Sequence, residues 1–215
     1  MKTTVVGLLV LISVHASRGQ LVNGSLENTQ GTFSPSGGYM ELAVGSTALP
    51  GWTVVANSVS WLPNGNQWNL TTPYGNMFLD LSGNHDNGAY GGIAQTITTV
   101  PSQTYRLSLS LGSQQGQSIF IGPMSVMAKA GAASQSFMFT PSGSGNQWGS
   151  FSFNFVATSS STLLTITGTG SAGGSYLGLD DVQVVAVPEP LSSSILASGG
   201  MILLGCWRKS APKSA

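Results

Sequence analysis

The stretch Thr104-Tyr105-Arg106-Leu107-Ser108-Leu109-Ser110-Leu111 alternates polar and apolar side chains along its whole length. This period of two places successive side chains on opposite faces of a β-strand, so that one face meets a hydrophobic core and the other meets water. The segment 151–155 repeats the pattern, with phenylalanines separated by Ser152 and Asn154. Strands with one apolar face are typical of antiparallel sheets.

Strand-like segments recur at short spacing on both sides of these two, whereas a helical period is scarce. The expected strands span residues 52–55, 59–62, 77–81, 93–100, 104–111, 118–128, 134–140, 150–156, 163–167 and 182–187. Glycine, asparagine and serine are common between them, which favours tight polar turns. A series of this kind predicts an all-β fold made of two packed sheets.

The N-terminus has the order of a secretory signal peptide. A short basic start precedes an apolar segment at 5–14, which is too short to span a bilayer stably, and small residues follow. We therefore expect a signal peptide over 1–19, with cleavage between Ala16 and Gln20. Cys206, the single cysteine of the chain, lies near the other end, so the body between the two ends contains no disulfide.

The body of the protein is mildly acidic. Five of the seven Lys and Arg residues belong to the two ends, and residues 20–187 contain two basic and six acidic side chains, a net charge of −4. Nucleic-acid binding needs clustered Lys and Arg to neutralise phosphates, so nucleic acid is not expected as a partner. The size of the body fits one domain, which we place at 20–186.

The C-terminal segment 187–215 begins with Val187-Pro188-Glu189-Pro190. A stretch at 191–207 follows, with ten apolar residues diluted by Ser and Gly, and then a basic tail at 208–215 that begins with Arg208-Lys209. This order resembles the PEP-CTERM sorting signal of Gram-negative bacteria, although the basic end is sparser than in that family. The apolar stretch is at the short limit of a membrane span, which suits a temporary anchor.

The PEP-CTERM resemblance implies a route and a destination. An exosortase-type transpeptidase would recognise the signal, and the segment 191–207 would reside transiently in the inner membrane. The protein would then be exported to the cell surface or to the extracellular matrix of a Gram-negative bacterium.

Five short motifs mark the body in a fixed order. They are Leu21-Val22-Asn23-Gly24-Ser25-Leu26-Glu27, Leu49-Pro50-Gly51-Trp52-Thr53-Val54, Phe78-Leu79-Asp80-Leu81, Gly91-Gly92-Ile93-Ala94-Gln95-Thr96 and Leu179-Asp180-Asp181-Val182. Together they resemble the galactose-binding-like sandwich family, and more narrowly a domain family of unknown function found in plant cell-wall proteins and bacterial secreted proteins. The resemblance implies a two-sheet jelly-roll sandwich. Leu26 stands where the family usually has Phe, and either residue can fill a core position.

The same resemblance implies a structural Ca²⁺ site. Related modules bind this ion near the first and last strands, which here points to Glu27 and one of Asp180 or Asp181. A hard cation prefers carboxylate and carbonyl oxygens. The alternative is that these acids cap turns or face solvent. We expect no other cofactor.

The aromatic residues favour carbohydrate binding. Sugar rings stack their C–H faces on aromatic rings, while Asn, Gln and Asp bind the hydroxyls. Trp61, Trp68 and Tyr74 lie in the Asn- and Gly-rich segment 61–76 and form the candidate platform. The alternative for each of them is packing in the core.

These observations together predict a non-enzymatic protein of the extracellular polysaccharide matrix, with polysaccharide as its partner. A structural or adhesive protein without a small ligand is one alternative. A glycan hydrolase is another, because the six carboxylates of the body allow an acid pair, although no spacing favours one. A serine hydrolase is not expected, because the chain contains no Gly-x-Ser-x-Gly motif.

Overall fold

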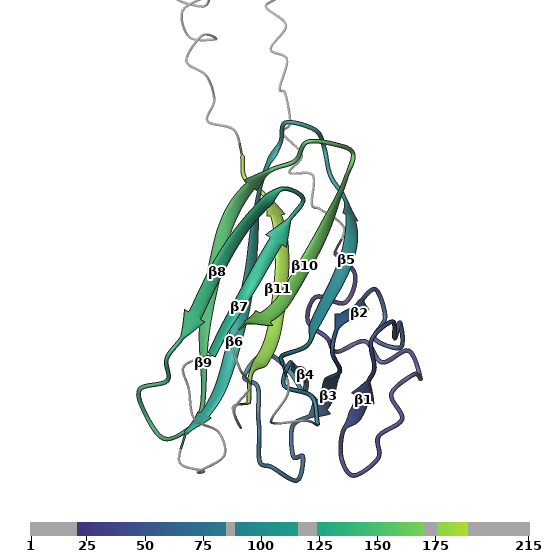
Figure 1. The fold of residues 1–215 in the computed structure, drawn as a ribbon, viewed down its shortest axis with the longest axis vertical. Helices are drawn as coiled ribbons and strands as arrows, with labels where there is room; N and C mark the ends of the chain where they lie inside the picture. The colour runs from purple at the N-terminus through teal and green to yellow at the C-terminus, as the bar shows by residue number, and fades with distance from the viewer. Residues whose placement is uncertain (1–20, 85–88, 116–123, 170–175, 189–215) are drawn as a thin grey trace, which may run out of the picture.

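The computed structural model describes residues 21–84, 89–115, 124–169 and 176–188 (Figure 1). Within these ranges the chain forms eleven β-strands and no helix. The strands are β1 (Met40–Leu42), β2 (Thr53–Ala56), β3 (Val59–Pro63), β4 (Met77–Asp80), β5 (Gly92–Thr98), β6 (Thr104–Gln115), β7 (Met124–Ala130), β8 (Ala133–Phe139), β9 (Gly145–Val156), β10 (Ser161–Thr169) and β11 (Gly178–Ala186).

The strands pair antiparallel and form two sheets. The six-stranded sheet has the order β1-β3-β4-β11-β6-β9, and the five-stranded sheet has the order β2-β5-β10-β7-β8. Figure 1 shows the two layers with their long strands side by side. The predicted all-β, two-sheet jelly-roll sandwich is therefore confirmed.

The stretch that opens the sequence argument forms β6, which pairs with β9 along its whole length. Its apolar side chains all point between the sheets and are buried: Tyr105, Leu107, Leu109 and Leu111. The serines between them lie on the outer face. Ser110 is nevertheless only 1% exposed, so part of this outer face is covered by other residues.

Each of the ten expected strands has a counterpart in the structure. β1 was not expected, because three residues are too few to show an alternating pattern. The strand expected at 118–128 is described from Met124 onward, since residues 116–123 lie outside the described ranges.

A second hydrophobic cluster lies outside the six-stranded sheet, separate from the main core between the sheets. Its fully buried members are Leu62, Leu70, Phe78 and Tyr176. On β3 and β4, Leu62 and Phe78 point away from the main core because their neighbours Trp61 and Leu79 point into it. The loop 64–76 between these strands folds over the outer face and buries Leu70 there, which contributes roughly 1.5–3 kcal/mol.

The chain leaves the sandwich at the end of β11, where the Val187 N–H donates to the carbonyl oxygen of Thr104 at 2.8 Å. Of the predicted sorting motif, Val187 and Pro188 are described. The rest of that prediction lies outside the described residues: the signal peptide 1–19, Glu189, Pro190, the segment 191–207, Arg208 and Lys209. Among the residues that are described, no helix is long and apolar enough to cross a membrane.

Candidate functional site

The first half of the loop 64–76 is built around Asn66, which is 4% exposed. Its Nδ2 donates to the carbonyl oxygens of Pro63 and Leu70, both at 2.8 Å. Its Oδ1 accepts the backbone N–H groups of Trp68 at 3.1 Å and Leu70 at 3.2 Å. One side chain therefore replaces the backbone partners that a strand would supply.

Asn64 holds the second half of the loop in the same way. Its Nδ2 donates to the carbonyl oxygens of Thr72 at 3.2 Å and Gly75 at 3.0 Å, and its Oδ1 accepts the Thr72 N–H at 2.8 Å. The two asparagines fix the loop before any ligand arrives. Side chains on this loop are consequently preorganised, which lowers the entropic cost of binding.

Trp148 of β9 lies flat on the outer face of the six-stranded sheet. A Cβ added at Gly112 of β6 would lie 2.6–2.8 Å from three atoms of the six-membered ring of the indole. Because these distances are nearly equal, the face of the ring rests on Gly112. Gly178 of β11 is next to Gly112, and a Cβ there would lie 2.9 Å from the ring. The two glycines make room for the indole.

Three further contacts fix the indole of Trp148. Its Nε1–H donates to the carbonyl oxygen of Thr71 at 2.7 Å. The rings of Phe78 and Tyr74 both meet it edge-on, with centroids 6.0 Å away and interplanar angles of 86° and 83°. Edge-to-face packing of this kind is the geometry that aromatic quadrupoles favour. The indole is thus held on one face and at its edges.

Beside this aromatic pair is an open depression of about 330 Å³. Its lining residues are Thr71, Thr72, Pro73, Tyr74, Asn146 and Trp148. The Tyr74 hydroxyl lies 3.2 Å from Ser150 Oγ, and Asn146 joins β9 to the loop through its Nδ2, which donates to the Asn69 carbonyl at 2.8 Å. The depression therefore combines two half-exposed aromatic rings with hydroxyl and amide groups, as small-ligand sites do.

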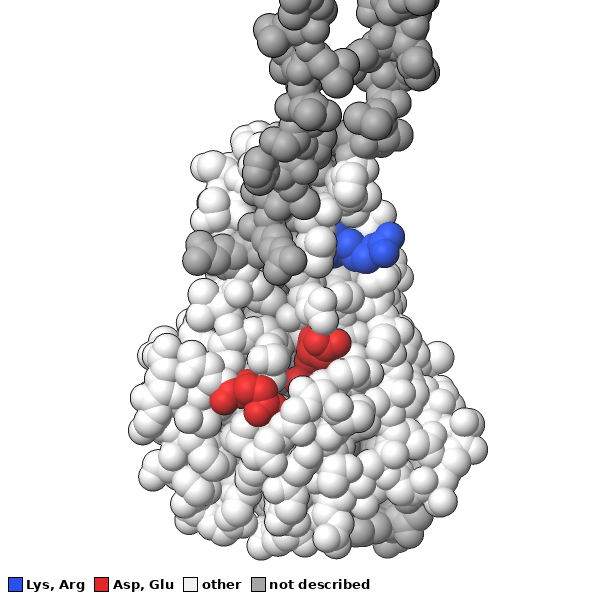
Figure 2. Space-filling model, turned by 180° about the vertical axis from the view of Figure 1, so that it is seen from behind, with Lys and Arg blue, Asp and Glu red and all other residues white. Residues whose placement is uncertain are grey.

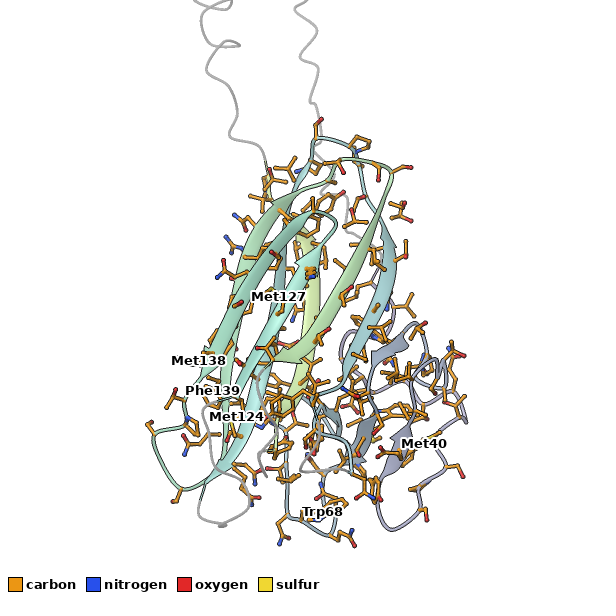
Figure 3. All side chains as sticks on the ribbon, in the orientation of Figure 1. Met40, Trp68, Met124, Met127, Met138 and Phe139 are labelled. Carbon is orange, nitrogen blue, oxygen red and sulfur yellow. The ribbon has the colours of Figure 1, made fainter. Side chains whose placement is uncertain are left out.

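Trp68 lies on the other side of the loop, where its ring packs on Tyr39 with centroids 5.1 Å apart. In Figure 3 it is labelled at the end of the molecule opposite to the exit of the chain. The adjoining cavity of about 50 Å³ is lined by Ser60, Leu62, Trp68, Leu70, Asp80, Gly83 and Asn84. This volume holds water molecules, but it is well below the size of ligand pockets.

The structure separates the three predicted platform residues. Trp61 is fully buried in the main core, where its Nε1–H donates to the Leu26 carbonyl at 3.1 Å and its ring meets Phe33 edge-on. It therefore cannot stack on a ligand. Trp68 and Tyr74 are half-exposed, but they line different hollows.

The sequence argument did not single out Trp148, which is the partner of Tyr74. One signal was present. Along β6 the outward residues Ser108 and Ser110 are followed by Gly112, and a glycine facing outward in a strand often marks a close approach by another group. The sequence could not identify Trp148 as the residue that approaches Gly112, because this identification requires the register between β6 and β9.

The predicted metal ligands Glu27 and Asp180 are brought near each other. Asp180 is fully buried, with Oδ2 accepting the Thr72 hydroxyl at 2.5 Å and Oδ1 accepting the Asp181 N–H at 2.6 Å. The pKa of Asp180 is raised from 3.8 to about 7, chiefly by burial and also by the charges of Glu27 and Asp181, while the two hydrogen bonds lower it. A buried carboxyl beside like charges favours either a proton or a bound cation.

A β-bulge between Asp180 and Gln183 turns Asp181 differently from its neighbour. The Asp181 backbone has a φ of 49°, and its Oδ1 accepts the Gln183 Nε2–H at 2.7 Å. Glu27 Oε1 accepts the N–H groups of Asn76 and Met77 at 2.8 and 2.7 Å. Across the described ranges, no three His, Cys, Asp or Glu side chains gather as a metal-binding group.

These donors fit a hard cation in kind but supply two carboxylates where Ca²⁺ takes six to eight oxygens. Glu27 and Asp180 would hold the ion, and backbone oxygens and water would have to complete its shell. Asp181 contributes negative charge to the region while its carboxylate is engaged by Gln183.

Solved structures with a similar fold include sugar-binding proteins. An arabinose-bound α-L-arabinofuranosidase, MgGH51, matches 80% of this chain and 27% of its own, with a TM-score of 0.50 and 15% identity. TmCBM61 in complex with β-1,4-galactotriose matches 80% of this chain and all of its own, with a TM-score of 0.42 and 15% identity. The CBM22-1 xylan-binding domain of Paenibacillus barcinonensis Xyn10C matches 74% of this chain and all of its own, with a TM-score of 0.42 and 14% identity. At these identities the likeness concerns the fold.

Among proteins known by sequence, halomucin of Haloquadratum walsbyi is 30% identical to this chain over 201 residues. The match takes in 88% of this chain and 2% of halomucin, so the chain corresponds to a small part of that protein. A family model matches residues 19–184, from the end of the predicted signal peptide to the last strand. The chain therefore belongs to the family described as "protein of unknown function (DUF642)".

Proposed function

We propose that the protein binds carbohydrate at Trp148 and Tyr74, on the outer face of the six-stranded sheet. The observation that carries this proposal is the indole of Trp148, which rests with one face on Gly112 and borders an open depression. A ring supported from below and fixed at its edges is a rigid platform on which the C–H face of a sugar can stack.

The groups around the platform suit a sugar more than a charged metabolite. The depression is lined by hydroxyl, amide and aromatic side chains, without an acidic or basic residue. Hydroxyls and amides both donate and accept hydrogen bonds, as the hydroxyls of a sugar require. The loop that carries Tyr74 is already fixed by Asn64 and Asn66, so little ordering remains to be done on binding.

Binding to a glycan array, followed by titration with the best ligand, tests this proposal. We expect Trp148→Ala to weaken binding roughly thirtyfold, since loss of a central aromatic contact costs about 2 kcal/mol. Met138→Ala is the matched control, because Met138 is 64% exposed on the opposite sheet. Tyr74→Phe keeps the ring and removes the contact with Ser150, so it should weaken binding less than Trp148→Ala.

The control for folding is the melting temperature of each variant. Wild-type affinity in a folded Trp148→Ala variant would refute the proposed site. Absence of binding to every glycan on the array would refute the proposed function.

We propose binding without catalysis. Asp80 and Asp180 are both buried, and the cavity beside Asp80 is about 50 Å³. An acid pair that cleaves a glycoside must reach the glycosidic oxygen from an open cleft. Release of reducing ends from a bound polysaccharide, lost in Asp80→Asn or Asp180→Asn, would overturn this part of the proposal.

We also propose that Glu27 and Asp180 hold a structural Ca²⁺. Support comes from the buried Asp180 carboxyl, whose pKa is raised by burial and then by the neighbouring acids. Calorimetric titration of chelator-treated protein should give heat with Ca²⁺, and Ca²⁺ should raise the melting temperature. Glu27→Gln should abolish both effects, whereas no heat and no shift in the wild type would exclude the site.

We propose, finally, that residues 1–19 export the protein and that 187–215 sort it to the cell surface through an exosortase-type enzyme, where it joins the polysaccharide matrix. The order of Val187-Pro188-Glu189-Pro190, the apolar segment and the basic tail supports this route. Mass spectrometry of surface protein should find a start between Ser17 and Gln20 and no peptide that ends at Ala215. An intact Ala215 terminus on surface protein would contradict the sorting step.

One observation favours self-association as a second function. β8 and β9 each form one of the two edges of their sheet, and neither contains a charged residue. Charged side chains on an edge are a common barrier to pairing with another chain. Sedimentation at rising protein concentration tests this, with Ser136→Lys on β8 expected to suppress any assembly. A monomer at all concentrations would exclude it.

A further inference from the structure

We propose that the bound glycan extends from the aromatic pair along β6 and β9 and carries an acidic sugar unit that pairs with Arg106. This inference rests on the proposed carbohydrate binding and names the class of glycan. It concerns the outer face of the six-stranded sheet beyond the depression at Trp148.

A strip of small polar residues continues the platform. In the register of β6 and β9, Ser110 is opposite Ser150 and Ser108 is opposite Ser152, and the next outward pair is Arg106 and Asn154. From Ser150, which the Tyr74 hydroxyl contacts, to Asn154 the strand advances about 14 Å. No large side chain of these two strands stands on this stretch, so an extended chain can lie along it.

Arg106, at the far end of the strip, has N–H groups that are available to bind a ligand. Its side chain is exposed, and its Nε–H donates to Asn154 Oδ1 at 3.3 Å. Arg106 forms no ion pair with any residue that the structure describes. A guanidinium has five N–H donors, and two parallel ones match the oxygens of a carboxylate. Arg106 also borders an open depression of about 210 Å³ near Val187 and Pro188.

On the outer face of the six-stranded sheet, the charged residues favour binding of an anion only at the Arg106 end of the strip. Figure 2 shows a mostly uncharged surface, with basic atoms toward one end and acidic atoms below them. Asp181 and Gln183 flank the strip on β11, so negative charge lies beside its middle. Lys129, the other basic residue of the body, faces outward from the opposite sheet, beside Thr165. Arg106 is therefore the place on this face where a carboxylate gains a partner.

The net charge of the body restricts the ligand further. With a charge of −4, the body repels a densely charged polyanion. A mostly neutral glycan with an isolated acidic unit avoids this repulsion and still uses Arg106. The expected ligand is thus a neutral backbone with sparse uronic acid units, rather than a polyuronate.

The experiment uses an array of matched oligosaccharides with xylan, galactan, glucan and mannan backbones, each with and without one uronic acid unit. For the backbone that binds, we expect the acidic member to bind about tenfold more tightly, as charge-assisted hydrogen bonds are the stronger kind. Arg106→Gln should remove this preference and leave the affinity for the neutral member unchanged. Lys129→Gln removes the same charge from the other face and should keep the preference.

Two further results would support the pairing. Arg106→Lys should restore part of the preference, and the preference should shrink as the salt concentration rises, because exposed charges are screened. Equal binding of both members by the wild type, or a preference that survives in Arg106→Gln, would overturn the inference. If Trp148→Ala still weakens binding in that case, the proposed function stands without it. If no member binds at all, both fail.

Discussion

The outer faces of the two sheets are made from similar strands but differ in how far other residues cover them. On the five-stranded sheet, outward residues form ordinary cross-strand pairs, such as Thr165 with Lys129 and Thr167 with Met127. On the six-stranded sheet, the loop 64–76 and Tyr176 cover the middle strands and bury a second cluster. The sandwich thus supplies two comparable surfaces, and the loop 64–76 builds the candidate site on one of them.

The difference is visible in the strands themselves. β10 alternates buried and less buried side chains, as a strand with one wet face should. β4 is buried at every position because both of its faces are covered. A covered face needs partners for its polar groups, and Asn64, Asn66 and Thr72 supply them. We call the outer face of the six-stranded sheet the covered face and the outer face of the five-stranded sheet the bare face. The covered face should be sensitive to substitutions that the bare face tolerates.

The largest expected effect comes from Asn66→Ala. This change removes four hydrogen bonds and leaves backbone groups of a buried loop without partners. We expect the free energy of unfolding to fall by about 3 kcal/mol or more. Gln67→Ala is the control on the same loop, since Gln67 is exposed. Equal losses in the two variants, measured by chemical denaturation, would mean that Asn66 does not organise the loop.

A slightly smaller effect is expected from the ionisation of Asp180. Its folded-state pKa of about 7 is above the ordinary 3.8, so the folded protein favours the protonated form. The stability that this proton contributes is complete below pH 3.8 and is lost as the pH rises through about 7. With a chelator present, we expect a loss of about 2–3 kcal/mol between pH 5 and pH 8.

The measurement is chemical denaturation at both pH values in Asp180→Asn, which resembles the protonated acid and should lack this part of the pH dependence. Asp181→Asn serves as the neighbouring control. A pH dependence of stability that is the same in Asp180→Asn and wild type would show that another group carries it.

Gly112→Ala should have a moderate effect. The added Cβ would lie 2.6 Å from the indole of Trp148, so the ring must move off the sheet. Overpacking of this kind costs about 1–2 kcal/mol. Glycan affinity should fall with it, because the platform is displaced. Thermal unfolding and a glycan titration check the two effects, and unchanged glycan affinity would separate Trp148 from the binding site.

The smallest effect should come from the bare face. Thr165→Ala removes a half-buried side chain that stands opposite Lys129 and Ala94 in the five-stranded sheet. We expect a change within about 0.5 kcal/mol and unaltered glycan binding. A loss as large as that of Gly112→Ala would mean that the two outer faces are not different in the way described.

The bare face and the main core could be predicted from the sequence, and the covered face could not. The alternation in β6 and β9 predicted both strands because one face of each meets the core. Val59-Ser60-Trp61-Leu62 does not alternate, because all four side chains are buried on one face or the other. The sequence therefore could not tell that Trp61 points into the core while Leu62 supports the loop.

The acids show the same limit. Glu27 and Asp180 are far apart in the chain, and only a resemblance suggested that they meet. A β-bulge gives Asp180 and Asp181 different surroundings. It depends on the register of β11 with β6, which cannot be read from two adjacent aspartates in the sequence. The sequence did not indicate Trp148 as a site residue for a similar reason. The position of its ring depends on Gly112, which lies in another strand.

The position of Val187 beside Thr104 has a mechanical consequence. Trp148 is opposite Gly112, which pairs with Gly178 at the start of β11, so the aromatic pair and the exit of the chain lie at opposite ends of this strand. From Gly178 to Pro188 the chain advances about 30 Å. A molecule attached to any support through the residues after Pro188 would therefore hold its aromatic pair outward, on a rigid arm that sweeps the space above the support. Under the proposed function, many copies held in this way would engage one long glycan at the same time, which strengthens the overall binding.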